Sequence, residues 1–233
     1  MVWQAVPLQR EQGSLWKQAG LPTSLQGSNW KGESSLNLLV NSPDSLLASF
    51  RSKVSPGQLT LIAGPSGSGK TSWCLRLANA AVTLQIQPRG LISPAVFLDE
   101  NKIAIDLVDL VSGENRRLAV RRGTTSSIET TPSGYAMQDW LIDPLVISWG
   151  NQILSKLSIK NKLLILDELG PLELLEDTGL TAGLELINSR TYRMACVVVR
   201  SGLVQNALER WPWAKVIDIN NQAARLNGDD LNT

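Results

Sequence analysis

The chain has 233 residues, of which 43% are hydrophobic and 18% charged, a balance that is ordinary for a globular protein. Its formal net charge of +1 gives no electrostatic reason to expect nucleic acid as a partner. The absence of histidine excludes histidine-assisted nucleophiles and histidine-ligated zinc. We therefore expect any proton transfer to use carboxylates, lysine, tyrosine or water.

The sequence also bears on where the protein resides. No apolar run approaches the length of a membrane span, and residues 1–7 lack the positive start and apolar stretch of a secretory signal. Cys74 and Cys196 fall within a predicted helix and a predicted strand, and we expect both to be small buried residues. These features predict a cytoplasmic protein that makes no contact with a membrane.

The first part of the chain differs from the rest. Residues 1–40 are rich in Gln, Ser, Gly and Asn, carry three tryptophans and show no sustained periodicity. Because fully disordered segments have few aromatic residues, we expect this segment to dock onto its own domain or onto a protein partner. We accordingly divide the chain into an N-terminal extension, residues 1–50, and a main domain, residues 51–233.

A helix is predicted near the end of this extension. Ser42 or Asp44 would cap it, and Leu46, Leu47 and Phe50 would form its apolar stripe.

Strands and helices then alternate along the main domain. The predicted strands are 59–63, 90–98, 102–110, 116–120, 162–167, 195–200 and 215–219, and the predicted helices are 72–81, 139–157, a segment ending near 189, and 204–210. A short polar link at 99–101 would turn the second and third strands into a hairpin, and residues 123–134 are typical of an exposed loop. This order predicts an α/β fold with a mainly parallel central sheet, helices on both faces and an inserted β-hairpin.

A phosphate-binding loop follows the first strand. Residues 64–71 match the pattern G-x-x-x-x-G-K-[ST], with an apolar strand before them and a helix after them. The glycines let successive amides point into one concavity, and the helix N-terminus adds its positive dipole end. We predict that the nucleotide-binding residues are Gly64, Pro65, Ser66, Gly67, Ser68, Gly69, Lys70, Thr71 and Ser72. Lys70 would reach the β- and γ-phosphates of a nucleoside triphosphate, and the Thr71 hydroxyl would hold Mg²⁺.

The second half of the predicted site is an apolar strand that ends in two acids. Residues 163–166 are Leu-Leu-Ile-Leu, as in a strand buried on both faces, and Asp167 and Glu168 follow. Since ligands bind at the carboxyl ends of parallel strands, Asp167 would hold Mg²⁺. Glu168 would position or activate the water that attacks the γ-phosphate.

The residues after this strand narrow the family. Residues 167–173, Asp-Glu-Leu-Gly-Pro-Leu-Glu, resemble a signature of the THEP-type nucleoside-triphosphatases, which include the human cancer-related nucleoside-triphosphatase. The segments 90–110 and 134–135 are also similar to that family, and the resemblance covers about residues 57–220. It implies a P-loop fold of the RecA-like, additional-strand class. It also implies slow, Mg²⁺-dependent hydrolysis of ATP, GTP and other nucleoside triphosphates with loose base preference.

The chain departs from the family in its hairpin. The family usually has an acid and an arginine in the first hairpin strand, where this chain has Pro-Ala-Val-Phe at 94–97, and its usual Gly-Phe is Ala104-Ile105 here. These changes bear on substrate range and rate. Glu173, a signature residue, would either orient the magnesium shell or cap the following helix.

Several arginines could stabilise charge in the transition state. The candidates are Arg116, Arg117, Arg121, Arg122 and Arg200. Charge runs such as 116–122 are usually solvated faces, whereas Arg200 ends a predicted core strand and is better placed near the phosphates.

Three alternatives accompany the hydrolase hypothesis. Residues 55–70 look like the start of an ABC-transporter ATPase, but the L-S-G-G-Q motif and the switch histidine of that class are absent. A small-molecule or polynucleotide kinase would use the same loop, with 111–134 as a lid, although adjacent Asp and Glu favour water activation. A nucleotide-controlled interaction module would use residues 1–40. No N-K-x-D element selects guanine, so the sequence predicts no base preference.

Overall fold

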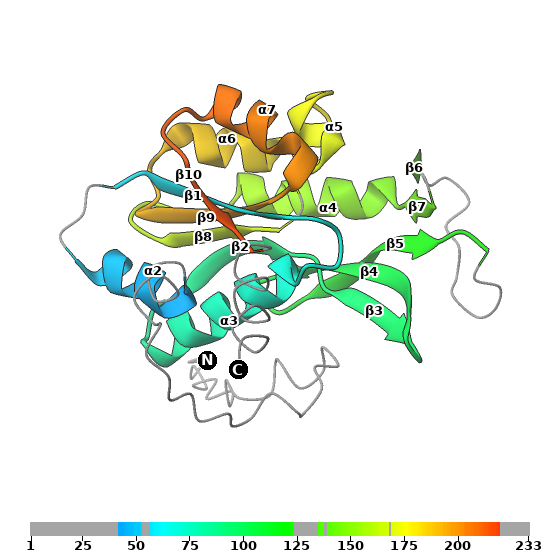
Figure 1. The fold of residues 1–233 in the computed structure, drawn as a ribbon, viewed down its shortest axis with the longest axis horizontal. Helices are drawn as coiled ribbons and strands as arrows, with labels where there is room; N and C mark the ends of the chain where they lie inside the picture. The colour runs from blue at the N-terminus through cyan, green and yellow to red at the C-terminus, as the bar shows by residue number, and fades with distance from the viewer. Residues whose placement is uncertain (1–41, 53–55, 124–134, 138, 168, 220–233) are drawn as a thin grey trace, which may run out of the picture. The chain divides into compact units, whose positions relative to one another are not determined.

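A computed structural model of the chain describes residues 42–52, 56–123, 135–137, 139–167 and 169–219 (Figure 1). The strands of this part form one 10-stranded sheet in the order β10-β1-β9-β8-β2-β4-β5-β7-β6, with β3 paired to β4. Helices α2 and α3 lie on one side of the sheet, and α4, α5, α6 and α7 lie on the other (Figure 1). The expected α/β architecture with helices on both faces is confirmed.

The bounds of the elements follow the alternation expected from the sequence. The strands are β1 (Gln58–Gly64), β2 (Pro88–Ile92), β3 (Ala95–Leu98), β4 (Asn101–Asp109), β5 (Asn115–Arg121), β6 (Tyr135–Met137), β7 (Trp140–Ile142), β8 (Leu163–Leu166), β9 (Met194–Arg200) and β10 (Lys215–Asp218). The helices are α2 (Pro43–Arg51), α3 (Lys70–Thr83), α4 (Pro144–Ser155), α5 (Pro171–Leu174), α6 (Thr181–Ser189), the 3₁₀ turn η3 (Ser201–Leu203) and α7 (Val204–Arg210). None of the helices in the described ranges has the length and apolar character needed to cross a bilayer.

The parallel half of the sheet consists of β10, β1, β9, β8 and β2. Each neighbouring pair among these five strands runs parallel. All four residues of β8 are buried, as are the six from Met194 to Val199 in β9, because helices cover both faces. Strand β9 lies between β1 and β8, which is the arrangement expected of the additional-strand class.

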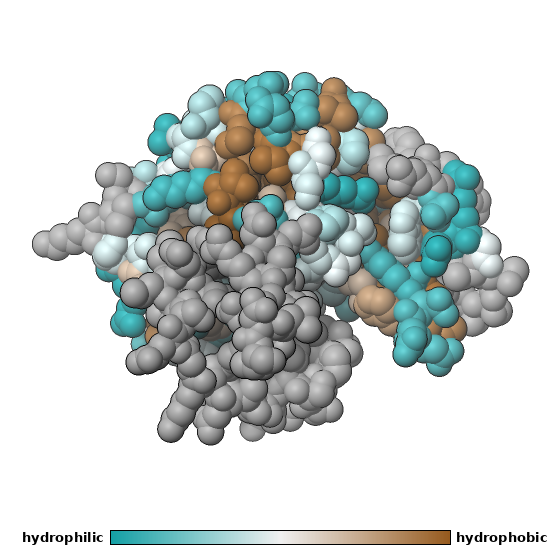
Figure 2. Space-filling model, viewed as in Figure 1, coloured by the Kyte–Doolittle hydropathy of each residue, from teal (hydrophilic) through white to brown (hydrophobic). Residues whose placement is uncertain are grey.

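Two apolar layers enclose this half. Leu164 and Leu166 of β8 belong to one buried cluster with Leu154 of α4 and Ile187 of α6. In the space-filling view, hydrophobic residues gather beneath the upper helices, whose outer side is mainly hydrophilic (Figure 2). On the opposite face, α3 buries Trp73. Cys74 and Cys196 are both free and buried, as predicted.

The antiparallel wing continues the sheet through β4, β5, β7 and β6, with β3 beside β4. All of its strand pairs are antiparallel, beginning with β2 against β4. The expected hairpin is present as β3 and β4. However, the single strand predicted over 90–98 is wrong, because it divides into β2 and β3 at Ser93 and Pro94. Pro94 has no amide for a ladder, and the Ser93 amide is directed to a side chain, that of Asp167.

Gly90 marks the junction between the two halves. It lies in β2 opposite Ile165 of β8, at a φ of +119°. A Cβ atom at this position would lie 2.0 Å from the Ile165 carbonyl oxygen. On the other side, the Gly90 carbonyl accepts a hydrogen bond of 3.0 Å from the Leu110 amide, just after β4. The close approach of β2 to β8 therefore requires glycine.

Two predicted helices also need correction. The helix expected over 139–157 begins only at Pro144, because Asp143 caps it by accepting the Leu145 amide at 2.8 Å and proline occupies its first turn. Trp140 belongs instead to β7, paired with β5. The helix expected to end near 189 is two helices, α5 and α6, separated by a segment in which Gly179 has a φ of +70°.

Helix α2 packs on the body of the domain. The Ser42 hydroxyl accepts the Ser45 amide at 3.2 Å, which makes Ser42 the cap, and Leu47 is fully buried. At the other end, Arg193 donates to the carbonyls of Phe50 and Ser52 and lies 5.3 Å from the Phe50 ring centroid. The end of α2 is thus held by a residue that immediately precedes β9.

Candidate active site

The phosphate loop joins a central strand to a helix N-terminus. β1 ends at Gly64, α3 begins at Lys70, and Gly69 precedes the helix with a φ of +88°, in the left-handed region that favours glycine. No side chain caps α3. The first amides of this 14-residue helix therefore have no side-chain acceptor at the cap, which is the arrangement that suits phosphate oxygens.

Two polar side-chain groups lie at the phosphate loop: the Lys70 amine and the Ser68 hydroxyl. The Lys70 Nζ donates to the carbonyl oxygens of Gly64 at 2.8 Å and Pro65 at 2.6 Å, so its charge lies across the loop. The Ser68 hydroxyl is buried without a hydrogen-bond partner among the described residues. A buried hydroxyl in that state is unfavourable unless a ligand or water completes it, so the loop is suited to an oxygen-rich ligand.

The other predicted loop residues lie around these two. Pro65, Ser66 and Gly67 are exposed, and Ser72 is exposed in the first turn of α3. Thr71 is half-buried beside it. The structure thus brings the residues expected from the sequence into one turn between β1 and α3.

Asp167 is fixed at the carboxyl end of β8. It is only 1% exposed, and its Oδ2 accepts the Ser93 amide at 3.1 Å. Its own amide donates to the Leu91 carbonyl at 3.0 Å. The end of β2 therefore orients this carboxylate. Ser93 was not predicted to have a role, although a polar residue directly after an apolar strand is the same signal that identified Asp167.

Asp167 lies at the same edge of the parallel sheet as the phosphate loop, since β1 and β8 both run parallel to β9 and flank it. Burial raises the pKa of the Cys74 thiol well above its ordinary value of 9.0, and the negative charge of Asp167 raises this pKa further, against a smaller opposing effect of Arg76. Cys74 lies three residues after Thr71, one turn along α3. Thr71 in the first turn of α3 and Asp167 after β8 both supply oxygen donors, the kind that Mg²⁺ prefers. Glu168, the predicted water-positioning residue, lies outside the described residues.

Glu173 fills the capping role. It is 4% exposed, and its Oε2 accepts the Gly170 amide at 2.8 Å across the first turn of α5. Its Oε1 accepts the Leu180 amide at 2.8 Å, just before α6. A Cβ atom on Gly179 would lie 2.1 Å from that oxygen. Of the two roles expected for Glu173, these contacts match the cap and the joining of two helices.

The candidate arginines separate into two groups. Arg116 pairs with Glu114 at 2.8 Å and lies 4.7 Å from the Trp149 ring centroid, while Arg117 pairs with Asp106. These contacts hold both arginines on the wing. Arg200, in contrast, ends β9 directly beside Gly64 in the strand register.

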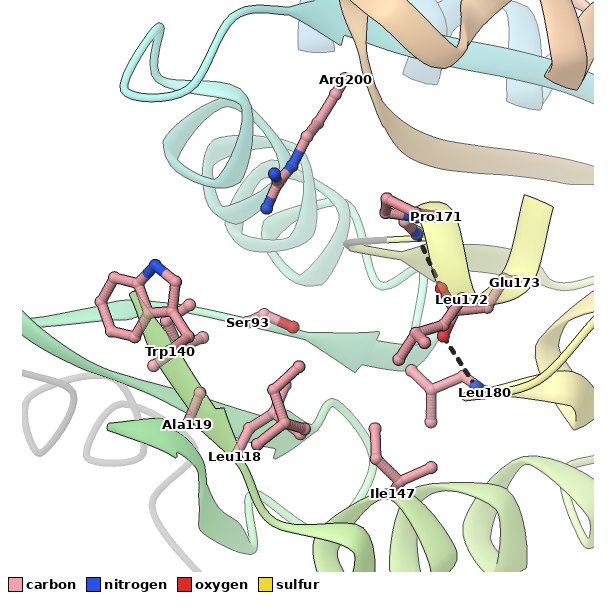
Figure 3. A pocket seen from close by; sticks show the side chains of 13 residues that line it. Ser93, Leu118, Ala119, Trp140, Ile147, Pro171, Leu172, Glu173, Leu180 and Arg200 are labelled. Carbon is pink, nitrogen blue, oxygen red and sulfur yellow. Dashed lines mark hydrogen bonds between the residues drawn. The ribbon is translucent and has the colours of Figure 1, made fainter. Parts of the chain in front are cut away.

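A cavity of about 190 Å³ lies beyond the carboxyl ends of β2, β8 and β9. The Arg200 side chain points toward it, Ser93 lies on its floor, and Trp140 stands at the opposite side from Pro171 (Figure 3). Most of the remaining lining comes from the wing and from α4. The candidate active site at this edge of the sheet thus has the phosphate loop on one side and this mainly apolar cavity next to it.

Comparison with known proteins identifies the family. A family model described as NTPase matches residues 60–225. The chain belongs to this NTPase family. The match begins within β1 and includes the phosphate loop, Asp167 and the whole wing.

Two curated relatives are similar in sequence, both named nucleoside-triphosphatase THEP1. One, from Methanothermobacter thermautotrophicus, is 28% identical over 117 residues, which are 49% of this chain and 61% of that protein. That alignment spans less than two thirds of the relative's own length. The other, from Caldivirga maquilingensis, is 25% identical over 172 residues, which are 72% of this chain and 90% of that protein.

Two solved structures have the same fold. The solution structure of a human cancer-related nucleoside triphosphatase superposes with a TM-score of 0.52 at 17% identity, covering 73% of this chain and 98% of that one. The crystal structure of THEP1 from the hyperthermophile Aquifex aeolicus gives 0.52 at 16% identity, covering 74% and 96%. The P-loop fold expected from the sequence is confirmed.

Proposed function

We propose that the protein hydrolyses nucleoside 5′-triphosphates to the diphosphate and phosphate, with Mg²⁺ as cofactor. The observation that carries this proposal is the meeting of two features. An uncapped helix N-terminus bears Lys70, and the buried Asp167 carboxylate follows β8 at the same edge of the parallel sheet as the phosphate loop. Membership of the NTPase family supports the same reaction.

Each residue has a separate role in the proposed reaction. The loop amides and Lys70 hold the phosphates and neutralise their charge, and the Lys70 Nζ would leave its carbonyl partners to do so. Thr71 and Asp167 would hold the metal, and the Ser93 amide keeps the Asp167 carboxylate in place. Mg²⁺, when bound, would supply positive charge that offsets the charge of the phosphates. Glu168 positions the attacking water, as the sequence predicts.

Other aspects of the proposal rest on the sequence. We propose loose base preference, since no guanine-selecting element is present. A cytoplasmic location and a protein partner bound through residues 1–40 also stay predictions, and those residues lie outside the described ranges.

The first test is phosphate release from ATP, GTP, CTP and UTP with Mg²⁺, comparing the wild type with Glu168→Gln. We expect release from several nucleotides by the wild type and none above background by the variant, with nucleotide binding retained. The exposed Glu185→Gln on α6 is the matched control and should behave as the wild type. Tight nucleotide binding without release by the wild type would contradict hydrolysis and favour a kinase or a switch. Equal release by both proteins would contradict the role of Glu168.

A further inference from the structure

The cavity beside Ser93 is suited to an apolar ring. Its apolar walls come from the wing, with Ile105, Leu118 and Ile142, and from Ile147 on α4. Trp140 stands at one edge (Figure 3). Cavities of about 150 Å³ hold one benzene ring, so about 190 Å³ can hold a ring or two fused rings.

Of the described residues that line this cavity, few carry polar side chains, and these differ in whether their hydrogen bonds are already made. Both Glu173 carboxylate oxygens accept backbone amides, the Ser93 amide donates to the Asp167 carboxylate, and the Ser93 hydroxyl donates to the Asp167 carbonyl oxygen at 3.4 Å. The Arg200 guanidinium instead points from β9 toward the cavity, and the ion pairs among the described residues do not include it (Figure 3). Among the described residues, Arg200 thus brings a positive charge to this cavity.

We propose that this cavity binds a second, non-nucleotide ligand: a small aromatic or fused-ring carboxylic acid. The ring would lie against the apolar walls, and the carboxylate would meet the Arg200 guanidinium. A nucleobase fits less well, because its ring edges carry several donors and acceptors that Ile105, Leu118 and Ile142 would leave without partners. A carboxylate on a flat ring matches a guanidinium, whose donors suit that planar group.

The cavity adjoins the proposed catalytic centre, so a ligand bound in it would lie close to the catalytic residues. Ser93 lines the cavity and also holds the Asp167 carboxylate, and Arg200 starts beside Gly64 of the phosphate loop. An acid bound here would therefore lie next to the residues proposed to handle the γ-phosphate. The inference itself requires no turnover, so it stands or fails independently of the proposed hydrolysis.

The test is calorimetric titration of the full chain, without nucleotide, with 2-naphthoate and with its neutral counterpart 2-naphthamide. We expect saturable one-to-one binding, with naphthoate about tenfold tighter because of its charge-assisted contact with Arg200. Arg200→Gln should remove that preference. Arg51→Gln, an exposed position in the last turn of α2, is the matched control and should keep it.

A second pair of variants tests the location. Ala119→Leu on β5 and Ile147→Phe on α4 fill the cavity from two different elements, and each should abolish binding of both compounds. Thermal unfolding shows which of the two variants is folded, so one can replace the other. Absence of naphthoate binding by the wild type would overturn the proposal. So would unchanged binding in a folded cavity-filled variant, or a preference for naphthoate that survives Arg200→Gln.

Discussion

The two halves of the sheet place chemistry in different ways. In the parallel half, strands end at one edge, so the phosphate loop after β1, Asp167 after β8 and Ser93 after β2 meet there through the backbone. In the antiparallel wing, successive strands reverse direction, and what reaches the site is the side chains of one face, such as Ile105, that line a cavity. The parallel half thus supplies the polar residues that follow its strands, and the antiparallel wing supplies an apolar wall.

The largest expected effect comes from removing the Lys70 charge, which tests whether the phosphate loop of the parallel half takes part in catalysis. Lys70→Ala should lower kcat by about 100- to 1,000-fold and weaken nucleotide binding, because Lys70 is the cation proposed to stabilise the transferred charge. Phosphate release and calorimetric binding of ATP measure the two effects. The exposed Lys160→Ala should change neither. A Lys70→Ala protein that turns over at the wild-type rate would remove the phosphate loop from the mechanism.

Substituting the glycine at the junction should break the link between the halves. Gly90→Ala places a methyl group against the Ile165 carbonyl at a φ of +119°, so we expect a loss of about 3 kcal/mol or more in the free energy of unfolding. Urea denaturation measures it. Gly123→Ala is the matched control, since it has a φ of +77° but open space around its Cβ, and it should lose only about 1 kcal/mol. Equal losses of stability in the two variants would show that the close approach of β2 to β8 does not require glycine at residue 90.

Substituting Glu173, which lines the cavity, tests whether this carboxylate stabilises the fold or serves the metal. Glu173→Gln weakens acceptance of the two buried amides and should lower the free energy of unfolding by about 1 to 3 kcal/mol. Urea denaturation again measures it, with the exposed Glu185→Gln as control. A variant of unchanged stability whose turnover needs more Mg²⁺ would assign Glu173 to the metal instead.

The smallest expected effect concerns pH and the core of the parallel half. Burial raises the pKa of the Cys196 thiol from 9.0 to about 12. The unfolded chain therefore releases this proton first, so its contribution is fully present below pH 9 and is lost as the pH rises toward 12, by about 1.4 kcal/mol per unit. Comparing unfolding of the wild type and Cys196→Ala from pH 8 to 10 isolates this contribution. Parallel curves would contradict it.

Local patterns explain why much of the parallel half was predictable. The phosphate loop specifies its own turn through Gly69, and the four apolar residues before Asp167 indicate a strand buried on both faces. Both signals lie within a few residues of the side chains that they identify. The predicted strands 59–63 and 195–200 accordingly correspond to β1 and β9 within one residue at each end.

The wing and the cavity depended on remote partners. Trp140 has helical spacing with its neighbours, but pairing with Arg121 of β5 makes it part of a strand. Ser93 gains its role only because Asp167, 74 residues later, accepts its amide. The cavity is formed by residues as distant in sequence as Ile105 and Arg200, so no local pattern could indicate it.

The hydrogen bonds from Arg193 to the end of α2 indicate where a minimal stable fragment of the chain would begin. Its guanidinium binds carbonyls at Phe50 and Ser52, and Leu47 is fully buried on the same helix. A fragment starting at residue 56 would leave that guanidinium without these acceptors and expose the surface that Leu47 covers. We expect limited proteolysis to spare α2 and a fragment starting at Ser42 to unfold as cooperatively as the full chain.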